Sequence, residues 1–355
     1  MKKLNKKNIA IASSGVILLI ILIILLLPKS KTKKNEVPKK DDKVKVEENV
    51  KEPEKQIKIV DINSKTRPIA VSINNTPVAV KVQEGLNKAY IVYEIPTEGS
   101  TSRLMAMFKD SEDVTIGTIR SARHNFMDFA LESDAIFAAY GWSSHAQLQL
   151  QQLHVIDYIN GMVHSKPFWR NNPEHLASEH TAYTSLSKLQ DFAYNTLKYK
   201  KESSDAKNTI LLNYVADDVD LSNKKDVMNA TEVSIPYGSV TTVFKYNPDT
   251  KMYTRVVNGT VAKDHKTKEE FTTKNVIVER LSYNLWDDKY YWNLLTTGSG
   301  EGYYITNGKA VPIKWSKSDR TSKTKYTYLD GSEIEVSDGR TYIEVQVTGR
   351  KTTIK

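Results

Sequence analysis

The chain of 355 residues contains no cysteine. This absence excludes a disulfide-stapled fold, a cysteine zinc site, an iron–sulfur cluster, a thiol nucleophile and a lipid anchor on cysteine. Aromatic residues make up only 9% of the chain, but the hydrophobic fraction of 39% is enough for ordinary globular cores. The length predicts two domains and some additional sequence.

Most of the chain also carries little net charge. The 51 Lys and Arg residues exceed the 42 Asp and Glu residues by 9. Residues 1–58 hold 15 lysines and 7 acidic residues, so they account for +8 and leave about +1 for the other 297 residues. Proteins that bind nucleic acid usually carry a basic patch on the folded domain. We therefore expect no nucleic-acid partner.

A long apolar run stands near the N-terminus. Residues 9–27 contain no charge, and a helix of this length, at ~1.5 Å per residue, just spans the ~30 Å core of a bilayer. The run exceeds the ~7–15 apolar residues of a cleaved signal peptide, and no A-x-A-like site follows it. We predict a transmembrane signal anchor at 9–27 and a cytoplasmic N-terminus at 1–8.

The lysine counts on the two sides of this run give little guidance on its orientation across the membrane. Four precede the run and six lie in residues 29–40, which weakly favours the opposite topology. The short N-terminus and signal-like position favour placing the folded domains outside the cell.

Residues 29–58 are rich in Lys, Glu and Asp and lack aromatic residues. They therefore cannot bury enough apolar surface to offset the conformational entropy that is lost when a chain becomes ordered. We predict a disordered charged tether over residues 28–66, either a solvated spacer or a contact for anionic lipid or wall polymer.

Residues 67–205 alternate between strand and helix patterns, which predicts an α/β domain. Apolar runs rich in β-formers predict strands at 68–73, 89–95, 102–108, 114–119 and 134–141. Helical spacing and N-cap residues predict helices at 122–131, 143–153 and 184–197.

Residues 206–355 begin with an apolar run at 209–216 and then show an almost wholly β pattern. Turn signals separate short alternating runs and predict tight hairpins. They are Asn247-Pro248-Asp249, Asn258-Gly259, Asn307-Gly308, Asp330-Gly331 and Asp338-Gly339. We predict a mostly antiparallel β domain, either a sheet or a small barrel-like structure.

Two glutamates stand where the predicted strand 89–95 ends. Glu94 lies in the strand and Glu98 follows Pro96. In an unbroken strand, residues 94 and 98 would be ~13 Å apart. Paired glycosidase carboxyl groups are closer, at ~5–9.5 Å. Pro96 argues against an unbroken strand, so the sequence does not give the distance between the two carboxyl groups. We choose Glu98 as candidate general acid or base, because Gly99 leaves room for a ligand, and Glu94 as its partner.

Arginines complete this cluster as candidate substrate-binding residues. A strand-to-helix turn exposes backbone N–H groups and favours anions, and functional groups gather at the carboxyl ends of strands in α/β sheets. The alternative is structural, with the two glutamates pairing with the arginines to brace the turn. The candidate binding residues here are Arg103, Arg120, Ser121 and Arg123.

Six of the seven histidines fall between residues 124 and 180. His175 and His180 are five residues apart, which on a helix places them on different faces, and H-E-x-x-H is absent. We predict no metal site. His180 and Tyr183 are candidate polar groups of the binding cleft, although a packed or surface role fits them equally well.

Other motifs give weaker signals. No serine has a G-x-S-x-G context and no P-loop is present, so a hydrolase triad and a nucleotide cofactor are not expected. The sequence GSGEG at 298–302 lies in a β region and is interpreted as a loop. The aromatic run Trp286, Tyr290, Tyr291 and Trp292 fits a β core better than a sugar-stacking surface.

Long stretches of both predicted domains match one family in order. The first domain contains NNTPVAVKVQEGLNKAYIVYEIPTEGSTSRLMAMF, IGTIRSAR, DAIFAAYG and HTAYTS; the second contains KNVIVER, GSGEGYYITNGKAVPIKWSK and YLDGSEIEVSDGRTYIEV. These segments, spread over about residues 65–350, resemble the YerB-like family, described as bacterial lipoproteins of uncharacterised function. The resemblance implies two domains and an extracytoplasmic location. The chain departs from the family's form because it lacks the lipobox cysteine.

Two functions follow as hypotheses. In the first, the protein is an envelope enzyme that cleaves peptidoglycan glycan strands, as a lytic transglycosylase or glycosidase, with Glu98 protonating the glycosidic oxygen and the arginines holding anionic groups. In the second, the same cleft binds a wall polymer, peptide or envelope protein without catalysis. Neither requires a cofactor. A cytosolic partner of a nucleic-acid enzyme would need the opposite topology.

Overall fold

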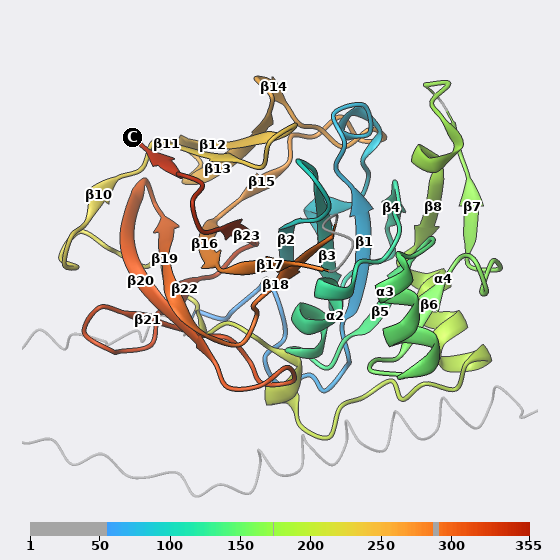
Figure 1. The fold of residues 1–355 in the computed structure, drawn as a ribbon. Coiled ribbons are helices and arrows are strands. Elements are labelled where there is room, and N and C mark those ends of the chain that lie inside the picture. The colour runs from blue at the N-terminus through green and yellow to red at the C-terminus, as the bar shows by residue number, and fades with distance from the viewer. Residues whose placement is uncertain (1–54, 173, 287–290) are drawn as a thin grey trace, which may run out of the picture. The chain divides into compact units, whose positions relative to one another are not determined.

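The computed structural model describes residues 55–172, 174–286 and 291–355 (Figure 1). The predicted N-terminal segment, membrane anchor and residues 28–54 of the predicted tether lie outside them. In the described part, no helix is both long enough and apolar enough to span a membrane. Ordered structure begins before Arg67, because Asp338 accepts hydrogen bonds from the backbone N–H groups of Lys58 and Ile59, at 3.0 and 2.9 Å, and Val60 is buried.

The main sheet has eleven strands, which both halves of the chain supply. Their order is β10-β20-β19-β16-β23-β2-β3-β1-β5-β6, with β21 beside β20. The first half contributes β1 (Ile69–Asn74), β2 (Ile91–Pro96), β3 (Ser102–Phe108), β5 (Ile136–Ala139) and β6 (Tyr158–Asn160). The second half contributes β10 (Met228–Asn229), β16 (Asn275–Leu281), β19 (Gly298–Thr306), β20 (Lys309–Lys317), β21 (Lys325–Tyr328) and β23 (Thr341–Val347).

Strand β23 joins the two halves. It pairs in parallel with β2 on one side and with β16 on the other. Strands β1 and β2 are both antiparallel to β3, and β5 and β6 continue in parallel from β1. Strands β1, β2, β5, β6, β16 and β23 therefore all run in one direction, and their carboxyl ends lie at one edge of the sheet. We call it the carboxyl edge.

A second sheet, wholly antiparallel, covers one face of the main sheet and lies across the top of Figure 1. It contains β11 (Glu232–Pro236), β12 (Thr241–Asn247), β13 (Met252–Val257), β14 (Thr260–Val261), β15 (Thr272–Thr273) and β24 (Thr353–Ile354). Smaller sheets pair β4 (Thr115–Gly117) and β7 (Phe168–Arg170) with β8 (Ala182–Ser185), β17 (Tyr283–Leu285) with β18 (Trp292–Leu294), and β9 (Tyr214–Val215) with β22 (Val336–Ser337).

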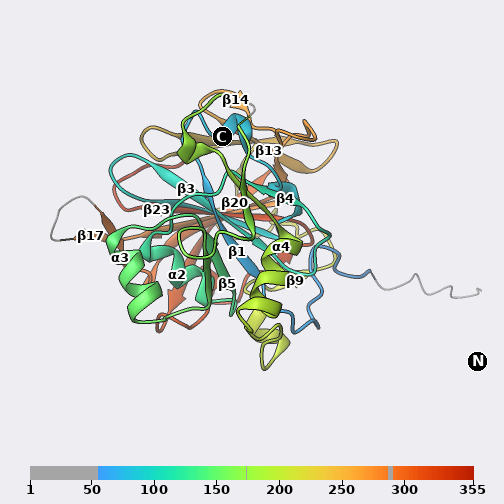
Figure 2. The ribbon, with the colours of Figure 1, turned by 90° about the vertical axis from the view of Figure 1, so that its right-hand side faces the viewer.

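The helices are short and lie on both faces of the main sheet. Helices α2 (His124–Leu131) and α3 (Ser144–Gln147) pack together in one apolar core, whereas α4 (Leu186–Asp191) packs in the other, and Figure 2 shows them on opposite sides of β1 and β5. The side chains of Ser143 and Ser185 cap α3 and α4 by accepting a hydrogen bond from the third residue beyond. Single turns of 3₁₀ or π helix complete the set: η1 (Val80–Val82), η2 (Leu86–Lys88), η3 (Leu148–Gln152), η4 (Ser178–His180), η5 (Phe192–Thr196) and η6 (Ala206–Thr209).

The sequence-based predictions of local structure are largely confirmed in the first half, where all five strands and three helices occur. The structure shows an α/β region and an antiparallel β sheet, as predicted. Helices predicted at 143–153 and 184–197 change to π geometry after one or two turns. The predicted boundary at 205/206 separates two parts of the sequence whose strands share the main sheet.

Two turn predictions in the second half were wrong. Asp338-Gly339 joins β22 to β23, which do not pair, because β23 runs parallel to β2 and β16 instead of turning back. The GSGEG segment is not a loop: it forms the first five residues of β19. The Asn307-Gly308 hairpin is confirmed, with both residues at positive φ, as a two-residue turn of type I′ requires.

A buried ionic network connects the two large sheets. The Glu94 carboxylate, on β2, pairs with Arg255 of β13 at 3.3 Å, and both side chains are 0% exposed. Glu94 also accepts hydrogen bonds from Ser102 at 2.7 Å and Thr242 at 2.8 Å. Burial and the charge of Glu94 raise the pKa of the neighbouring Glu344 well above its ordinary value. Glu94 is therefore a structural brace inside the protein.

We expect Arg255→Met to lower the free energy of unfolding by about 3–5 kcal/mol, because it leaves the Glu94 carboxylate buried without its cation. Denaturant unfolding followed by circular dichroism measures this. The control is Lys263→Met, which removes the solvent-exposed pair with Glu270 and should cost less than about 1 kcal/mol. Equal losses in the two variants would contradict the assigned role of Arg255.

Glu279 gives the fold a second testable property. Burial, followed by the charge of Glu132, raises its pKa to about 8, and its carboxyl accepts a hydrogen bond from Tyr326 at 2.6 Å. The native state thus holds a proton that the unfolded chain releases above pH ~4.3, so the free energy of unfolding should fall as pH rises towards 8. Glu279→Gln should make this fall smaller in pH-dependent denaturant unfolding, and the remaining fall comes from other carboxyl groups with raised pKa values, such as Glu344. The exposed Glu335→Gln should leave the full fall in place; a wild-type profile for Glu279→Gln would refute the assignment.

Candidate functional site

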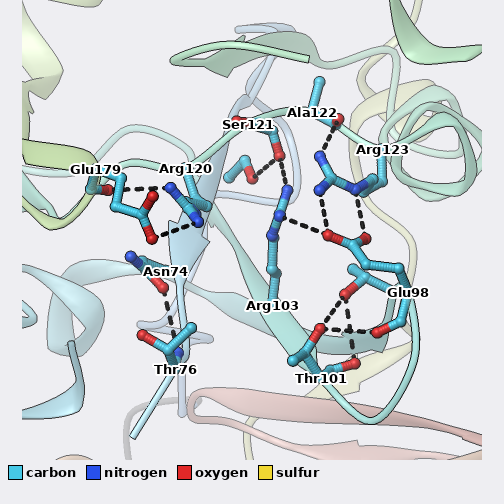
Figure 3. Close-up of polar contacts among 12 residues, drawn as sticks. Asn74, Thr76, Glu98, Thr101, Arg103, Arg120, Ser121, Ala122, Arg123 and Glu179 are labelled. Atoms are coloured by element: carbon cyan, nitrogen blue, oxygen red, sulfur yellow. Dashed lines mark hydrogen bonds and ion pairs between the residues drawn. The ribbon is translucent and has the colours of Figure 1, made fainter. Parts of the chain in front are cut away.

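The candidate site lies at the carboxyl edge, in the turn between β2 and β3. The backbone N–H of Thr97 donates to Thr101 at 3.0 Å, and that of Thr101 donates to Glu98 at 3.2 Å, which closes the turn. Gly99 adopts a positive φ of 61°, with open space where a side chain would stand. The turn directs the Glu98 side chain towards Arg123, as Figure 3 shows, and Arg123 is the residue before α2.

Glu98 is held between two arginines (Figure 3). Arg123 Nε donates to Glu98 Oε2 at 2.6 Å, and its Nη2 donates to Oε1, which makes a bidentate pair. Arg103 Nη2 lies 3.2 Å from Glu98 Oε1. The side chains of Arg103, Arg123 and Glu98 are 7%, 10% and 13% exposed. Two nearly buried guanidinium groups therefore share one carboxylate.

The charges shift the pKa values of this cluster. Burial alone would raise the pKa of Glu98, but hydrogen bonds and charge from Arg123 and Arg103 outweigh it and lower the pKa to about 2. Burial and the charge of Arg123 lower the pKa of Arg103 to about 9. Glu98 is thus ionised at neutral pH. In this arrangement it accepts hydrogen bonds and holds no proton to donate, and the cluster keeps an excess of positive charge.

Residues 120 and 121 form the wall of the cluster beside β1. The Arg120 backbone N–H donates to Ser72 at 2.9 Å, and Arg120 Nη2 lies 3.0 Å from the half-exposed carboxylate of Glu179. The Ser121 carbonyl accepts a hydrogen bond from Arg103 Nη1. Its side chain packs on Gly141, where a Cβ atom would lie 2.7 Å from Ser121 Oγ. Ser121 thus positions Arg103 through its backbone.

His180 and Tyr183 lie apart from Glu98. His180 follows Glu179 in sequence, and its Nδ1 accepts a hydrogen bond from the Asn74 amide at 2.7 Å, assigned from the neighbouring groups. Burial lowers the pKa of His180. Tyr183 is 1% exposed; its hydroxyl donates to the Val82 carbonyl at 2.9 Å. Its ring fills the space where Gly117 lacks a side chain, so Tyr183 is a core residue of the β4–β8 pairing.

The structure brings Glu98, Arg103, Ser121 and Arg123 together, with Arg120 in the neighbouring segment. It does not bring Glu94 to the cluster, since that carboxylate faces Arg255 between the sheets. Sequence reasoning missed Glu179, the partner of Arg120, because the link spans 59 residues and no local pattern marks it.

The sequence analysis also missed the grouping of two residues of the aromatic run, Trp286 and Tyr291, with histidines and Arg123. The His145 ring lies on the Trp286 ring with centroids 3.8 Å apart, and the Trp286 Nε1–H donates to His124 Nε2 at 3.0 Å. Burial, and then the charge of His145, lower the pKa of His124 to about 4. The ring of Tyr291 lies 5.6 Å from the Arg123 guanidinium, a cation–π contact. The rings of Trp286 and Tyr291 therefore lie at the start of α2, whereas Trp292 of β18 packs against the apolar core, as predicted for a β core.

Comparisons with known proteins match both halves of the chain. The profile described as protein of unknown function (DUF3048) N-terminal domain matches residues 57–200, and its C-terminal domain matches residues 233–343. YerB of Bacillus subtilis (strain 168), provisionally named a lipoprotein, is 30% identical over 286 residues, which cover 79% of this chain and 81% of that protein. These matches confirm the resemblance found in the sequence.

A solved structure shares the fold. The crystal structure of the YerB protein from Bacillus subtilis matches with a TM-score of 0.68 and 24% sequence identity, over 82% of this chain and 95% of that chain. At this identity the likeness concerns the fold alone. It extends across both halves, so the shared main sheet belongs to that fold.

Glu98→Gln tests the charge balance of the cluster. The folded state lowers the pKa of Glu98, so the pairing of its carboxylate with Arg103 and Arg123 stabilises the protein above pH ~4.3. This contribution is lost as pH falls towards about 2. We expect the variant to lose roughly 2–3 kcal/mol at pH 7 and to show a flatter decline between pH ~4.5 and ~2. Denaturant unfolding at several pH values measures both. Wild-type stability at pH 7 would disprove the pairing.

Proposed function

The chain belongs to the YerB family, and we propose that it is a membrane-attached, extracytoplasmic envelope protein whose arginine cluster binds anionic groups of a cell-wall polymer without cleaving it. The apolar run at 9–27 supports membrane attachment, since its length suits a single span. The name given to the Bacillus subtilis relative supports placement outside the cytoplasm. Peptidoglycan, or another anionic wall polymer, is the proposed partner.

One observation carries the binding function: Arg103 and Arg123 share the single carboxylate of Glu98. Nearly buried guanidinium groups are stabilised by full pairing, and here one negative charge serves two positive ones. A carboxylate or phosphate group of a ligand would complete the pairing, and arginine binds such groups with directed, often bidentate, hydrogen bonds. The ionised Glu98 then orients the arginines for the ligand.

The same geometry separates binding from glycan-strand cleavage. A general acid needs a pKa near the working pH, so that it holds a proton to transfer. Glu98, with a pKa of about 2, is ionised there, and Glu94 lies between the two large sheets. We therefore place Glu98 as a positioning residue and treat cleavage as the outcome that would replace the binding proposal.

The experiment is sedimentation of the full chain, purified in mild detergent, with isolated sacculi. We expect wild type to cosediment and Arg120→Gln and Arg123→Gln to weaken binding about tenfold. Lys88→Gln is the control, because that exposed lysine pairs with Glu112 away from the cluster. Circular dichroism confirms that the variants fold.

Three results would contradict the binding function, and a fourth would contradict the placement. The first is absence of wild-type binding, and the second is equal binding by all variants. The third is release of muropeptides by wild type but not by Glu98→Gln, which would establish catalysis; anhydro ends on the released fragments would identify a transglycosylase. A reporter fused at Lys355 that works only in the cytoplasm would refute the extracytoplasmic placement.

A further inference from the structure

A second site lies at the carboxyl edge, in a cavity of about 490 Å³ between β16 and β19. Its size is in the range of small-ligand pockets. The lining includes Arg280, Ser282, Ser299, Glu301, Trp315 and Arg350. None of these belongs to the Glu98 cluster, so the cavity is a distinct feature of the second half of the chain.

The cavity exists because two neighbouring strands separate. Strands β16 and β19 pair from Asn275–Thr306 to Glu279–Gly302 and no further. Beyond that point β16 continues beside β23, while β19 continues beside β20 to the Gly298–Lys317 pair. The GSGEG sequence thus forms a strand that has a partner on only one side at its start. Gly298 has open space where a Cβ atom would stand, whereas the same space at Gly300 is filled by the Trp315 ring and the Arg280 carbonyl.

The point where β16 and β19 separate, beyond the Glu279–Gly302 pair, is called the split here, and it exposes backbone groups of Ser299. The two-residue turn makes Thr306 and Lys309 a hydrogen-bonded pair, and such pairs then recur at every second residue of β19 down to Gly298. The N–H and C=O of Ser299 fall between them and point away from β20, towards the split. Within the described ranges neither group has a backbone partner. A ligand with both a donor and an acceptor, such as a peptide amide, could pair with both.

The charges of the cavity favour a singly charged anion. Arg280 stacks on Tyr303, with the guanidinium 5.1 Å from the ring centroid, and Arg350 lies 5.5 Å from the Trp292 ring. Neither arginine has a carboxylate within ion-pair distance in the described part of the chain. Arg280 Nε is buried without a hydrogen-bond partner. Glu301 opposes them at the exposed rim, so the net charge is about +1.

We propose that this cavity binds a short extended peptide, with its free carboxylate at Arg280 and Arg350 and its backbone beside Ser299. Arginine pairs with carboxylates, and an unpaired strand segment recognises peptide backbone by adding a strand. Glu301 is placed for an amino group of the same peptide. The site is independent of the anion-binding function proposed for the Glu98 cluster.

Isothermal titration calorimetry of the full chain in mild detergent tests the proposal, with tri-alanine as the probe. We expect tri-alanine to bind, and its C-terminal amide to bind at least tenfold more weakly, because the amide lacks the charge that the arginines recognise. Arg350→Gln and Arg280→Gln should each weaken tri-alanine binding about tenfold. Lys351→Gln is the matched control: the neighbouring exposed lysine is outside the cavity lining and should leave binding unchanged.

Ser299→Pro tests the backbone contact separately. Proline removes the N–H that points into the split and spares the hydrogen-bonded pairs with β20 on either side, so binding should weaken while the fold is kept. Arg123→Gln should not change tri-alanine binding, which distinguishes failure of this site from failure of the proposed wall-binding function. Equal binding of acid and amide, no binding of the acid, or tighter binding of inorganic phosphate would overturn the proposal.

Discussion

The parallel pairing of β23 with β2 and β16 is the constraint on which the rest of the structure depends. Residues 341–347 fill the gap between residues 91–94 and 275–281, so the last long strand of the chain completes the main sheet at its centre. Without it, the two halves would present open sheet edges, which are prone to unwanted association. With it, six strands end at the same edge, and both candidate binding sites form there.

Glu94 and Glu98 are only four residues apart, yet the local backbone geometry gives their carboxylates different roles. Glu94 lies within β2, so its side chain points between the sheets and balances Arg255. Glu98 lies beyond Pro96, in the turn, where its side chain reaches Arg103 and Arg123. Both are ionic, but burial makes the first a fixed part of the interior. The second lies in the turn at the carboxyl edge, nearly buried between its two arginines.

Local structure could be read from the sequence because it depends on neighbouring residues. Apolar runs of β-formers marked β1, β2, β3 and β5, and the Asn307-Gly308 pair marked a hairpin. The position of β23 could not be read, since its parallel partners lie about 65 and 250 residues away and parallel pairing leaves no turn signal between them. The same limit explains the wrong hairpin at Asp338-Gly339.

In the candidate site, too, contacts between residues near in sequence could be predicted and contacts between distant residues could not. The cluster of Glu98, Arg103 and Arg123 was visible because strand ends and turns gather polar residues. Arg255 was not, because an arginine in the alternating strand MYTRVV suggests a surface position, and only the covering sheet makes it buried. For Tyr183 the sequence left a cleft role and a packed role open, because its partner is a glycine of an adjacent strand that sequence spacing does not reveal. The strand character of GSGEG likewise depends on its partner β20.

The central position of β23 also affects the order in which the protein can be made. A ribosome delivers residues 341–347 after both β2 and β16, and until then these two strands have no common neighbour. Contacts of such long sequence separation form slowly, because the loop between them must close first. The chain therefore stays incompletely folded while most of it is already synthesised.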